Sequence, residues 1–230
     1  MTTITIETGD GRMNAYVATP KSSTGPALVV IQEIFGINQV ISDLTDGFAA
    51  LGYVAICPDL FWRIEPGIDI TDRTQAEWAR ASQLFQAFDV DKGVGDIART
   101  IAAIRTSPGS TGKVGAVGYC LGGKLAFLSA TRTDIDAAVG YYGVGLDQLL
   151  GEVKNLKKPL ALHIAGRDEY SPLPVRQKIH AVLDDNLLAT LYDYPDEDHA
   201  FARVGGQHYS NSSADLANNR TAAFFKQHLA

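Results

Sequence analysis

The chain lacks the features that mark secreted, membrane-spanning and nucleic-acid-binding proteins. It has only two cysteines, Cys57 and Cys120, which are too few for a disulfide framework and lack the paired spacing of a zinc site. No apolar stretch approaches the roughly 18 residues of a membrane span, and no basic and apolar leader opens the chain. With a net charge of −6 and no basic cluster, we expect a cytoplasmic monomer with no membrane or nucleic-acid partner.

The length and apolar content predict one domain of the α/β class, spanning residues 1–230. The chain has 230 residues, of which 46% are hydrophobic, enough for a single large core. Strand and helix patterns alternate along it, which predicts a mostly parallel, doubly wound sheet with helices on both faces. Two further features are expected: an antiparallel hairpin at residues 3–18, around a Gly9-Asp10-Gly11 turn, and a rim or cap segment at residues 59–88.

Strands are predicted at residues 3–8, 13–18, 26–33, 53–58, 113–118, 137–142, 159–165 and 189–194. Helices are predicted at residues 37–51, 72–87, 90–106, 124–130, 173–183 and 213–229.

The segment Gly118-Tyr119-Cys120-Leu121-Gly122-Gly123 has the pattern of a nucleophile elbow in which cysteine replaces serine. Such a turn between a strand and a helix holds its central side chain in a strained position at the strand's end, where it can attack a carbonyl. Glycines fit here because a side chain would collide with the neighbouring strand or helix. The alternative is that Cys120 is a small buried hydrophobic residue.

A catalytic cysteine needs a base and a group that orients the base, and the chain offers both. Asp168 follows the strand predicted at 159–165, and His199 follows the strand predicted at 189–194. The order nucleophile, acid, histidine is that of α/β-hydrolases, and the carboxyl ends of parallel strands meet at one edge. Alternatively, Asp168 caps the next helix, or His199 belongs to a solvated turn or weak cation site among Asp196, Glu197 and Asp198. No second histidine has a suitable metal-ligand spacing.

Six stretches resemble the dienelactone hydrolases (carboxymethylenebutenolidases), which are small α/β-hydrolases with a Cys-His-Asp triad. They are Gln32-Glu33-Ile34-Phe35-Gly36, Cys57-Pro58-Asp59-Leu60, Phe85-Gln86-Ala87-Phe88-Asp89, Val117 to Gly123, Gly140 to Gly145, and His199-Ala200-Phe201-Ala202-Arg203. The resemblance implies an α/β-hydrolase fold, a small lactone or ester as substrate, and no cofactor or metal.

The resemblance also implies roles for individual residues. Cys120 would be the nucleophile, His199 the base and then the acid, and Asp168 its orienting group. The amides of Leu121 and Ile34 would form the oxyanion hole, and Arg203 would bind a substrate carboxylate. The remaining assignments are Glu33 as an acid that helps to activate the thiol, and Phe35, Trp78, Arg80 and Tyr142 as substrate-binding residues.

Two of these assignments have their own physical arguments. Glu33 ends a strand that is otherwise apolar, so its carboxylate needs a partner, and a salt bridge to Arg203 or Arg80 is the alternative to a catalytic role. Trp78 stands where the family pattern has a second arginine, although Arg80 and Arg73 are near. One arginine and an indole would favour a less charged or bulkier substrate than two arginines would.

The predicted activity is hydrolysis of a dienelactone-type enol-lactone, giving a maleylacetate-like product through a thiol ester of Cys120. Two alternatives stay open. One is a broad carboxylesterase that acts on neutral esters with the same triad. The other is a redox or binding protein on a hydrolase scaffold, with Cys120 as a sensor thiol, because accessible thiolates oxidise readily.

Overall fold

The computed structural model describes residues 2–230, which form two compact units, Met1–Ala116 and Val117–Ala230. Eight strands follow the order β1-β2-β4-β3-β5-β6-β7-β8, and β5 passes through the boundary between the units. The strands are β1 (Thr2–Glu7), β2 (Arg12–Ala18), β3 (Gly25–Ile31), β4 (Val54–Pro58), β5 (Ser110–Tyr119), β6 (Ala137–Tyr141), β7 (Leu160–Ala165) and β8 (Ala189–Tyr194). The predicted mostly parallel sheet of the α/β-hydrolase fold is confirmed.

The helices are α1 (Gln39–Ala50), α2 (Gln75–Ala87), α3 (Val90–Arg105), α4 (Leu121–Arg132), α5 (Leu173–Leu183) and α6 (Asn211–Leu229). Two short 3-10 helices that the sequence did not predict, η1 (Leu146–Gln148) and η2 (Leu150–Asn155), follow β6. No described helix has the length and apolar character needed to cross a bilayer.

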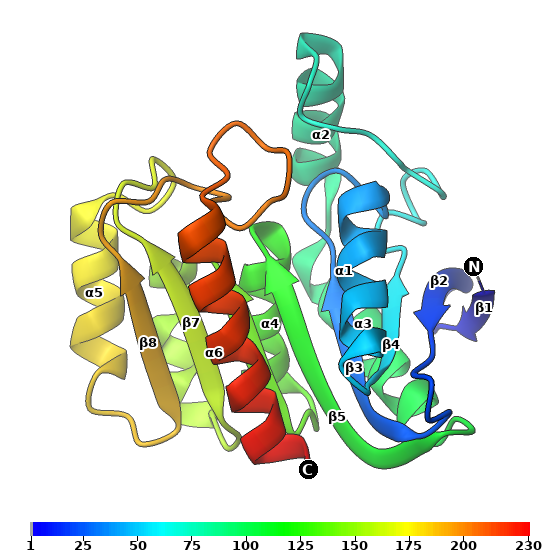
Figure 1. Ribbon diagram of the computed structural model, residues 1–230. Coiled ribbons are helices and arrows are strands. Elements are labelled where there is room, and N and C mark those ends of the chain that lie inside the picture. Colours follow the sequence, from blue (N-terminus) through cyan, green and yellow to red (C-terminus); the bar gives the residue numbers. More distant parts are fainter. Residues whose placement is uncertain (1) are drawn as a thin grey trace. The chain divides into compact units, whose positions relative to one another are not determined.

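In the first unit, the predicted hairpin is confirmed, since β1 pairs antiparallel with β2. β2 then pairs antiparallel with β4, and β4 pairs parallel with β3. Helices α1 and α3 both pack against β3 and β4, with α1 in front of the strands and α3 behind them in Figure 1. This double cover explains the continuous apolar run of β3, in which Ala27 to Ile31 are fully buried.

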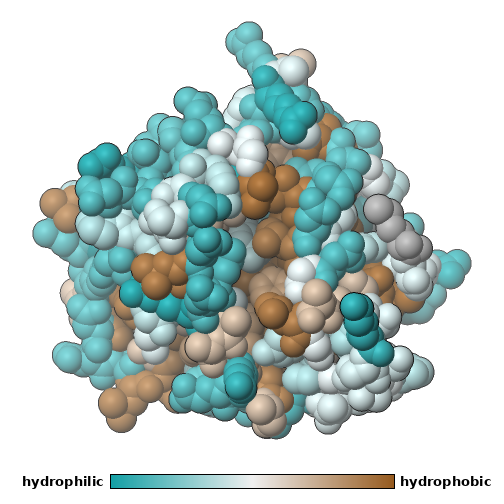
Figure 2. Space-filling view, viewed as in Figure 1, coloured by the Kyte–Doolittle hydropathy of each residue, from teal (hydrophilic) through white to brown (hydrophobic). Residues whose placement is uncertain are grey.

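Helix α2 covers little of the first unit. Of its side chains only Ala81 and Leu84 are buried, and the end of the helix that projects at the top of Figure 1 is largely hydrophilic in Figure 2. Thr74 is the N-cap of the helix, and its Oγ1 accepts a hydrogen bond from the amide of Glu77 (3.2 Å). Its exposure agrees with the rim or cap role predicted for residues 59–88, which stays a prediction.

In the second unit, β6, β7 and β8 run parallel in register, with Gly140 opposite Leu162 and His163 opposite Tyr192. Helix α6 lies in front of these strands in Figure 1 and packs on β6 and β7, while α4 packs on β6 and α5 on β8. Because the strands are parallel, the loops that follow β5, β7 and β8 leave from corresponding strand ends. These loops carry Cys120, Asp168 and His199.

Candidate active site

Cys120 occupies a strained turn between β5 and α4, as the elbow pattern predicts. Its backbone has φ 56° and ψ −112°, a conformation that costs energy for a residue other than glycine and persists only when its surroundings enforce it. The amide of Cys120 donates a hydrogen bond to the carbonyl of Tyr141 (3.0 Å). The side chain is not sealed in, since 8% of the residue remains exposed.

Two glycines of the elbow have clear steric reasons. A Cβ atom at Gly118 would lie 1.9 Å from the carbonyl oxygen of Gly122, and one at Gly123 would lie 2.5 Å from that of Tyr141. Both contacts are with backbone, so a side chain at either position would force the strand and the helix apart. The glycines therefore allow α4 to start directly beneath the thiol.

Asp168 and His199 form the hydrogen-bonded pair expected of an orienting acid and its base. Nδ1 of His199 lies 2.8 Å from Oδ2 of Asp168, and both residues are buried. The other oxygen, Oδ1, accepts a hydrogen bond from the amide of Tyr170 (2.8 Å). Asp168 does not cap the following helix, which begins at Leu173 after Pro172. The carboxylate thus closes its own turn with one oxygen and orients the imidazole with the other.

Burial and the two neighbours Cys120 and Asp168 act in opposite directions on the pKa of His199. Burial of the ring disfavours the imidazolium, but the negative charge of Cys120 and the hydrogen bond to Asp168 outweigh this effect and raise the pKa of His199 to about 10. Nε2 is buried, and no described atom meets the geometry of a full hydrogen bond to it, so the attraction to Cys120 is mainly Coulombic. The raised pKa favours the imidazolium form of His199 at neutral pH.

Two tyrosine rings flank the imidazole of His199. Tyr142 lies 5.1 Å away between ring centroids and Tyr170 lies 4.8 Å away, both edge to face. Tyr142 is buried and has a φ of 38°, whereas Tyr170 is half exposed at 51%. The sequence did not single out Tyr170. Its position two residues after Asp168, in the turn that follows β7, was the feature of the sequence that could have indicated a place near the site.

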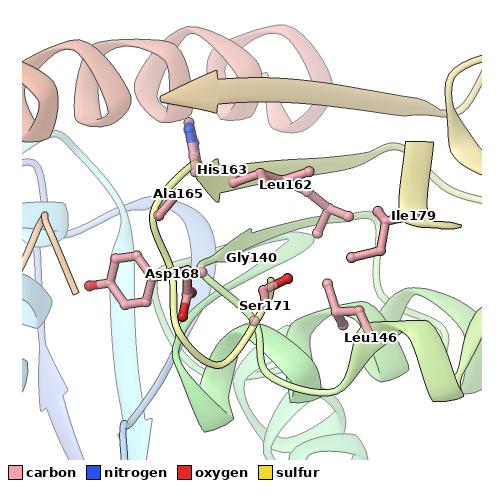
Figure 3. Close-up of a pocket in the computed structure, with 11 residues that line it drawn as sticks. Gly140, Leu146, Leu162, His163, Ala165, Asp168, Ser171 and Ile179 are labelled. Carbon is pink, nitrogen blue, oxygen red and sulfur yellow. The ribbon is translucent and has the colours of Figure 1, made fainter. Parts of the chain in front are cut away.

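A small cavity lies behind Asp168, among β6, β7, η1 and α5 (Figure 3). Its lining is mostly apolar, with Leu146, Leu162 and Ile179 opposite Asp168 and Ser171. Its volume of about 10 Å³ has room for no more than about one water molecule. It is therefore too small for a substrate and instead gives the carboxylate an apolar backing.

The loop that carries His199 is hydrogen-bonded to the N-terminal end of α6. Glu197 accepts hydrogen bonds from the hydroxyls of Ser210 (2.9 Å) and Ser213 (2.6 Å). Within the loop, Arg203 is buried, with 7% of its surface exposed, and its amide donates to the carbonyl of Ala200 (2.9 Å). His199 is therefore itself buried in a hydrogen-bonded part of the loop, although Asp196, three residues before it, is exposed.

Leu121 is the first residue of α4 in the second unit, and the remaining predicted site residues belong to the first unit. Glu33 and Ile34 are the second and third residues after the end of β3, and Glu33 is buried with 3% of its surface exposed. The rings of Phe35 and Trp78 meet edge to face at 5.3 Å. Arg80 forms an ion pair with Glu65, which engages one of the two arginines near Trp78. The roles predicted for these residues in catalysis and substrate binding stay predictions.

The chain is similar to known proteins along nearly its whole length. The profile of the "Dienelactone hydrolase family" matches residues 13–229. The chain belongs to the dienelactone hydrolase family. A protein of Azospirillum brasilense, provisionally named a carboxymethylenebutenolidase, is 52% identical over 234 residues that cover 100% of both chains. The carboxymethylenebutenolidase of Pseudomonas putida is 41% identical over 222 residues, covering 96% of this chain and 94% of its own.

A solved structure shows the same fold. The crystal structure from Klebsiella pneumoniae that is provisionally named a dienelactone hydrolase superposes with a TM-score of 0.82 at 26% identity, covering 99% of this chain and 100% of that one. This member of the dienelactone hydrolase family is therefore a hydrolase that acts on ester or lactone bonds.

Proposed function

We propose that the chain hydrolyses dienelactone-type enol-lactones through a thiol ester on Cys120, with His199 and Asp168 as base and orienting acid. The observation that carries this proposal is that Asp168, His199 and Cys120 interact in sequence within the second unit. Asp168 is hydrogen-bonded to Nδ1 of His199, and His199 is in turn coupled to the charge of Cys120. A sensor thiol needs neither an orienting carboxylate nor an elbow, and Cys57 is fully buried and does not serve as a resolving thiol.

In the proposed first half-reaction, Sγ of Cys120 attacks the lactone carbonyl carbon and forms a tetrahedral intermediate. The amide of Leu121 would bind its oxyanion, since the first amides of a helix lack intrahelical partners and the helix N-terminus favours negative charge. The predicted second donor is the amide of Ile34. The intermediate then collapses with cleavage of the carbon–oxygen bond, and the enolate leaving group takes a proton from His199.

In the second half-reaction, water adds to the thiol ester while Nε2 of His199 removes its proton. Cleavage of the carbon–sulfur bond releases the carboxylic acid product and restores the thiolate beside the imidazolium. An enol is a good leaving group, and thiolates react readily with esters that have one. This chemistry favours an enol-lactone over an amide as substrate.

The first test is the reaction of Cys120 with iodoacetamide in the wild type and in His199→Ala. We expect the alkylation rate at pH 7 to fall about 30-fold in the variant, because the neighbouring imidazolium that stabilises the thiolate is lost. Cys57 is a suitable internal reference, since burial raises its pKa far above the ordinary value and the structure leaves it inaccessible. Equal rates of Cys120 labelling in the two proteins, measured by mass spectrometry of the labelled peptide, would show that His199 is not the base.

One observation favours the second candidate, a carboxylesterase that acts on neutral esters. Arg80 is already paired with Glu65, and Trp78 stands where a second arginine was expected. Arg203 stays the predicted ligand of a substrate carboxylate.

Replacement of Arg203 by alanine distinguishes the two candidates. If the substrate is an anionic lactone, loss of a charge-assisted hydrogen bond should lower kcat/KM about 10- to 100-fold for cis-dienelactone and less than about 3-fold for p-nitrophenyl acetate. Arg203→Lys should recover part of the loss. Because Arg203 is buried, the melting temperature of each variant must be measured. A similar loss for both substrates would favour the neutral carboxylesterase.

A further inference from the structure

A buried polar network joins α6 to three strands of the second unit. It comprises Tyr141 on β6, His163 on β7, Tyr194 on β8, and Asn218 and Thr221 on α6. The hydroxyl of Thr221 lies 2.6 Å from that of Tyr141 and 2.9 Å from Nε2 of His163, whose Nδ1 lies 2.8 Å from the hydroxyl of Tyr194. The Tyr141 hydroxyl also donates to Oδ1 of Asn218 (3.0 Å). Figure 3 shows the His163 side chain on the α6 side of β7, away from Leu146 and Ile179.

Backbone strain in the second unit is concentrated at the proposed active site. Among its described residues other than glycine, those with positive φ are Cys120 (56°), Tyr142 (38°) and Ala200 (63°). They are the nucleophile, a residue whose ring contacts His199, and the residue that follows His199. Each such conformation is unfavourable by about 1–3 kcal/mol, so the surrounding structure must enforce it.

Two of the strained residues are hydrogen-bonded directly to network members, and the third is linked to the network only through the residue that follows it. Cys120 donates its amide hydrogen to the carbonyl of Tyr141 (3.0 Å), and Tyr142 donates to the carbonyl of His163 (2.8 Å). Ala200 is followed by Phe201, whose ring packs against that of Tyr194 at 4.7 Å. The ring of Tyr141 also packs at 4.7 Å against Tyr119, the residue before the nucleophile.

We propose that Thr221 is a positioning residue that, through Tyr141 and His163, holds the strained backbone of Cys120 and Tyr142 in the reactive geometry. Thr221 is fully buried, and its single hydroxyl bridges the side chains of the two residues whose carbonyls accept the strained amides. It touches no reacting atom. Its effect is to restrict how far the elbow and the base can move apart, and displacement of a reacting group by about 1 Å can lower a rate about 100-fold.

The experiment compares Thr221→Val, which removes the hydroxyl at nearly constant shape, with Thr221→Ser, which keeps it. Thr45→Val is the matched control, because Thr45 is also a fully buried helix residue whose hydroxyl donates to a backbone carbonyl, that of Ile41 (2.7 Å). For each protein, kcat, KM and the iodoacetamide alkylation rate of Cys120 are measured well below the melting temperature. Labelling of Cys57, which is fully buried in the folded protein, gives the fraction of unfolded molecules and corrects both rates for it.

For Thr221→Val we expect kcat and the alkylation rate of Cys120 to fall about 10-fold, with KM changed less than about 2-fold. Thr221→Ser and Thr45→Val should stay within about 2-fold of the wild type. If Thr221→Val lowers the melting temperature but leaves both corrected rates unchanged, Thr221 is merely structural and the proposal is wrong.

This inference rests on the proposed function, and its failure is distinguishable from that of the triad. Equal labelling of wild type and His199→Ala would overturn the triad. A slow His199→Ala variant beside an unchanged Thr221→Val variant would overturn the positioning role alone.

Discussion

Replacing Asp168 with asparagine should lower kcat about 1,000- to 10,000-fold with little change in KM. Oδ1 of Asp168 accepts the amide of Tyr170, and Oδ2 faces Nδ1 of His199. In Asp168→Asn, the side-chain oxygen will keep the hydrogen bond from the Tyr170 amide, so the new NH₂ group must face the imidazole. That contact forces Nδ1 to accept and places the ring proton on Nε2, which can then no longer act as the base.

The measurement is steady-state hydrolysis of a p-nitrophenyl ester near pH 7.5. Asp196→Asn provides a matched control, because Asp196 lies in the same loop region as His199 but pairs with Arg167 at the surface, with 80% of its side chain exposed. The control should keep its activity within about 2-fold, as expected for an exposed ion pair. Activity of Asp168→Asn within 10-fold of the wild type would contradict the orienting role of Asp168.

The sequence was sufficient to predict the α-helices and strands and to suggest the candidate triad residues because both depend on local chemistry. The apolar run at 26–33 is typical of a strand that is covered on both faces, and β3 is such a strand. The glycines around Cys120 predicted a close approach of α4 to neighbouring elements. Gly118 shows this approach between β5 and α4, and Gly123 shows it between α4 and the end of β6. A strand's end is also a local property, so positions just after β7 and β8 identified Asp168 and His199.

The features that the sequence did not predict arise from packing between distant elements. Tyr170 is an ordinary loop tyrosine until the fold brings its ring against His199. The pairing of Arg80 with Glu65 joins residues 15 positions apart across a loop. His163 lies within the buried strand β7, but nothing local indicates that its partners are Thr221 and Tyr194, 58 and 31 residues away.

The buried His163 should make the protein sensitive to acid. Burial and the positive charge of Arg220 lower the pKa of His163 from 6.5 to about 3, so the folded protein keeps this ring neutral. The groups that face the ring are Tyr194 and Thr221 by hydrogen bonds, and Tyr141 and Tyr192 by ring contacts. None of these supplies a negative charge at neutral pH that would stabilise an imidazolium.

The direction of the pH effect follows from which state binds the proton. Below pH 6.5 the unfolded chain takes up a proton at this histidine and the folded protein does not, so stability is lost as the pH falls from 6.5 toward 3. Each pH unit well below 6.5 removes up to about 1.4 kcal/mol, so about 3 kcal/mol should be lost by pH 4.5. Urea unfolding at pH 7 and pH 4.5 measures this loss.

His163→Gln isolates this contribution from those of the other titrating groups. The variant should be less stable than the wild type at pH 7, because the glutamine side chain cannot reproduce both hydrogen bonds to Thr221 and Tyr194. Its stability should nevertheless fall by about 3 kcal/mol less between pH 7 and pH 4.5. His180 provides the opposite control. Its hydrogen bonds to Asp184 and Asp193 outweigh its desolvation and raise its pKa. Its contribution to the free energy of unfolding is therefore retained as the pH falls. If wild type and His163→Gln lose the same free energy of unfolding over this range, His163 is not the source of the acid sensitivity.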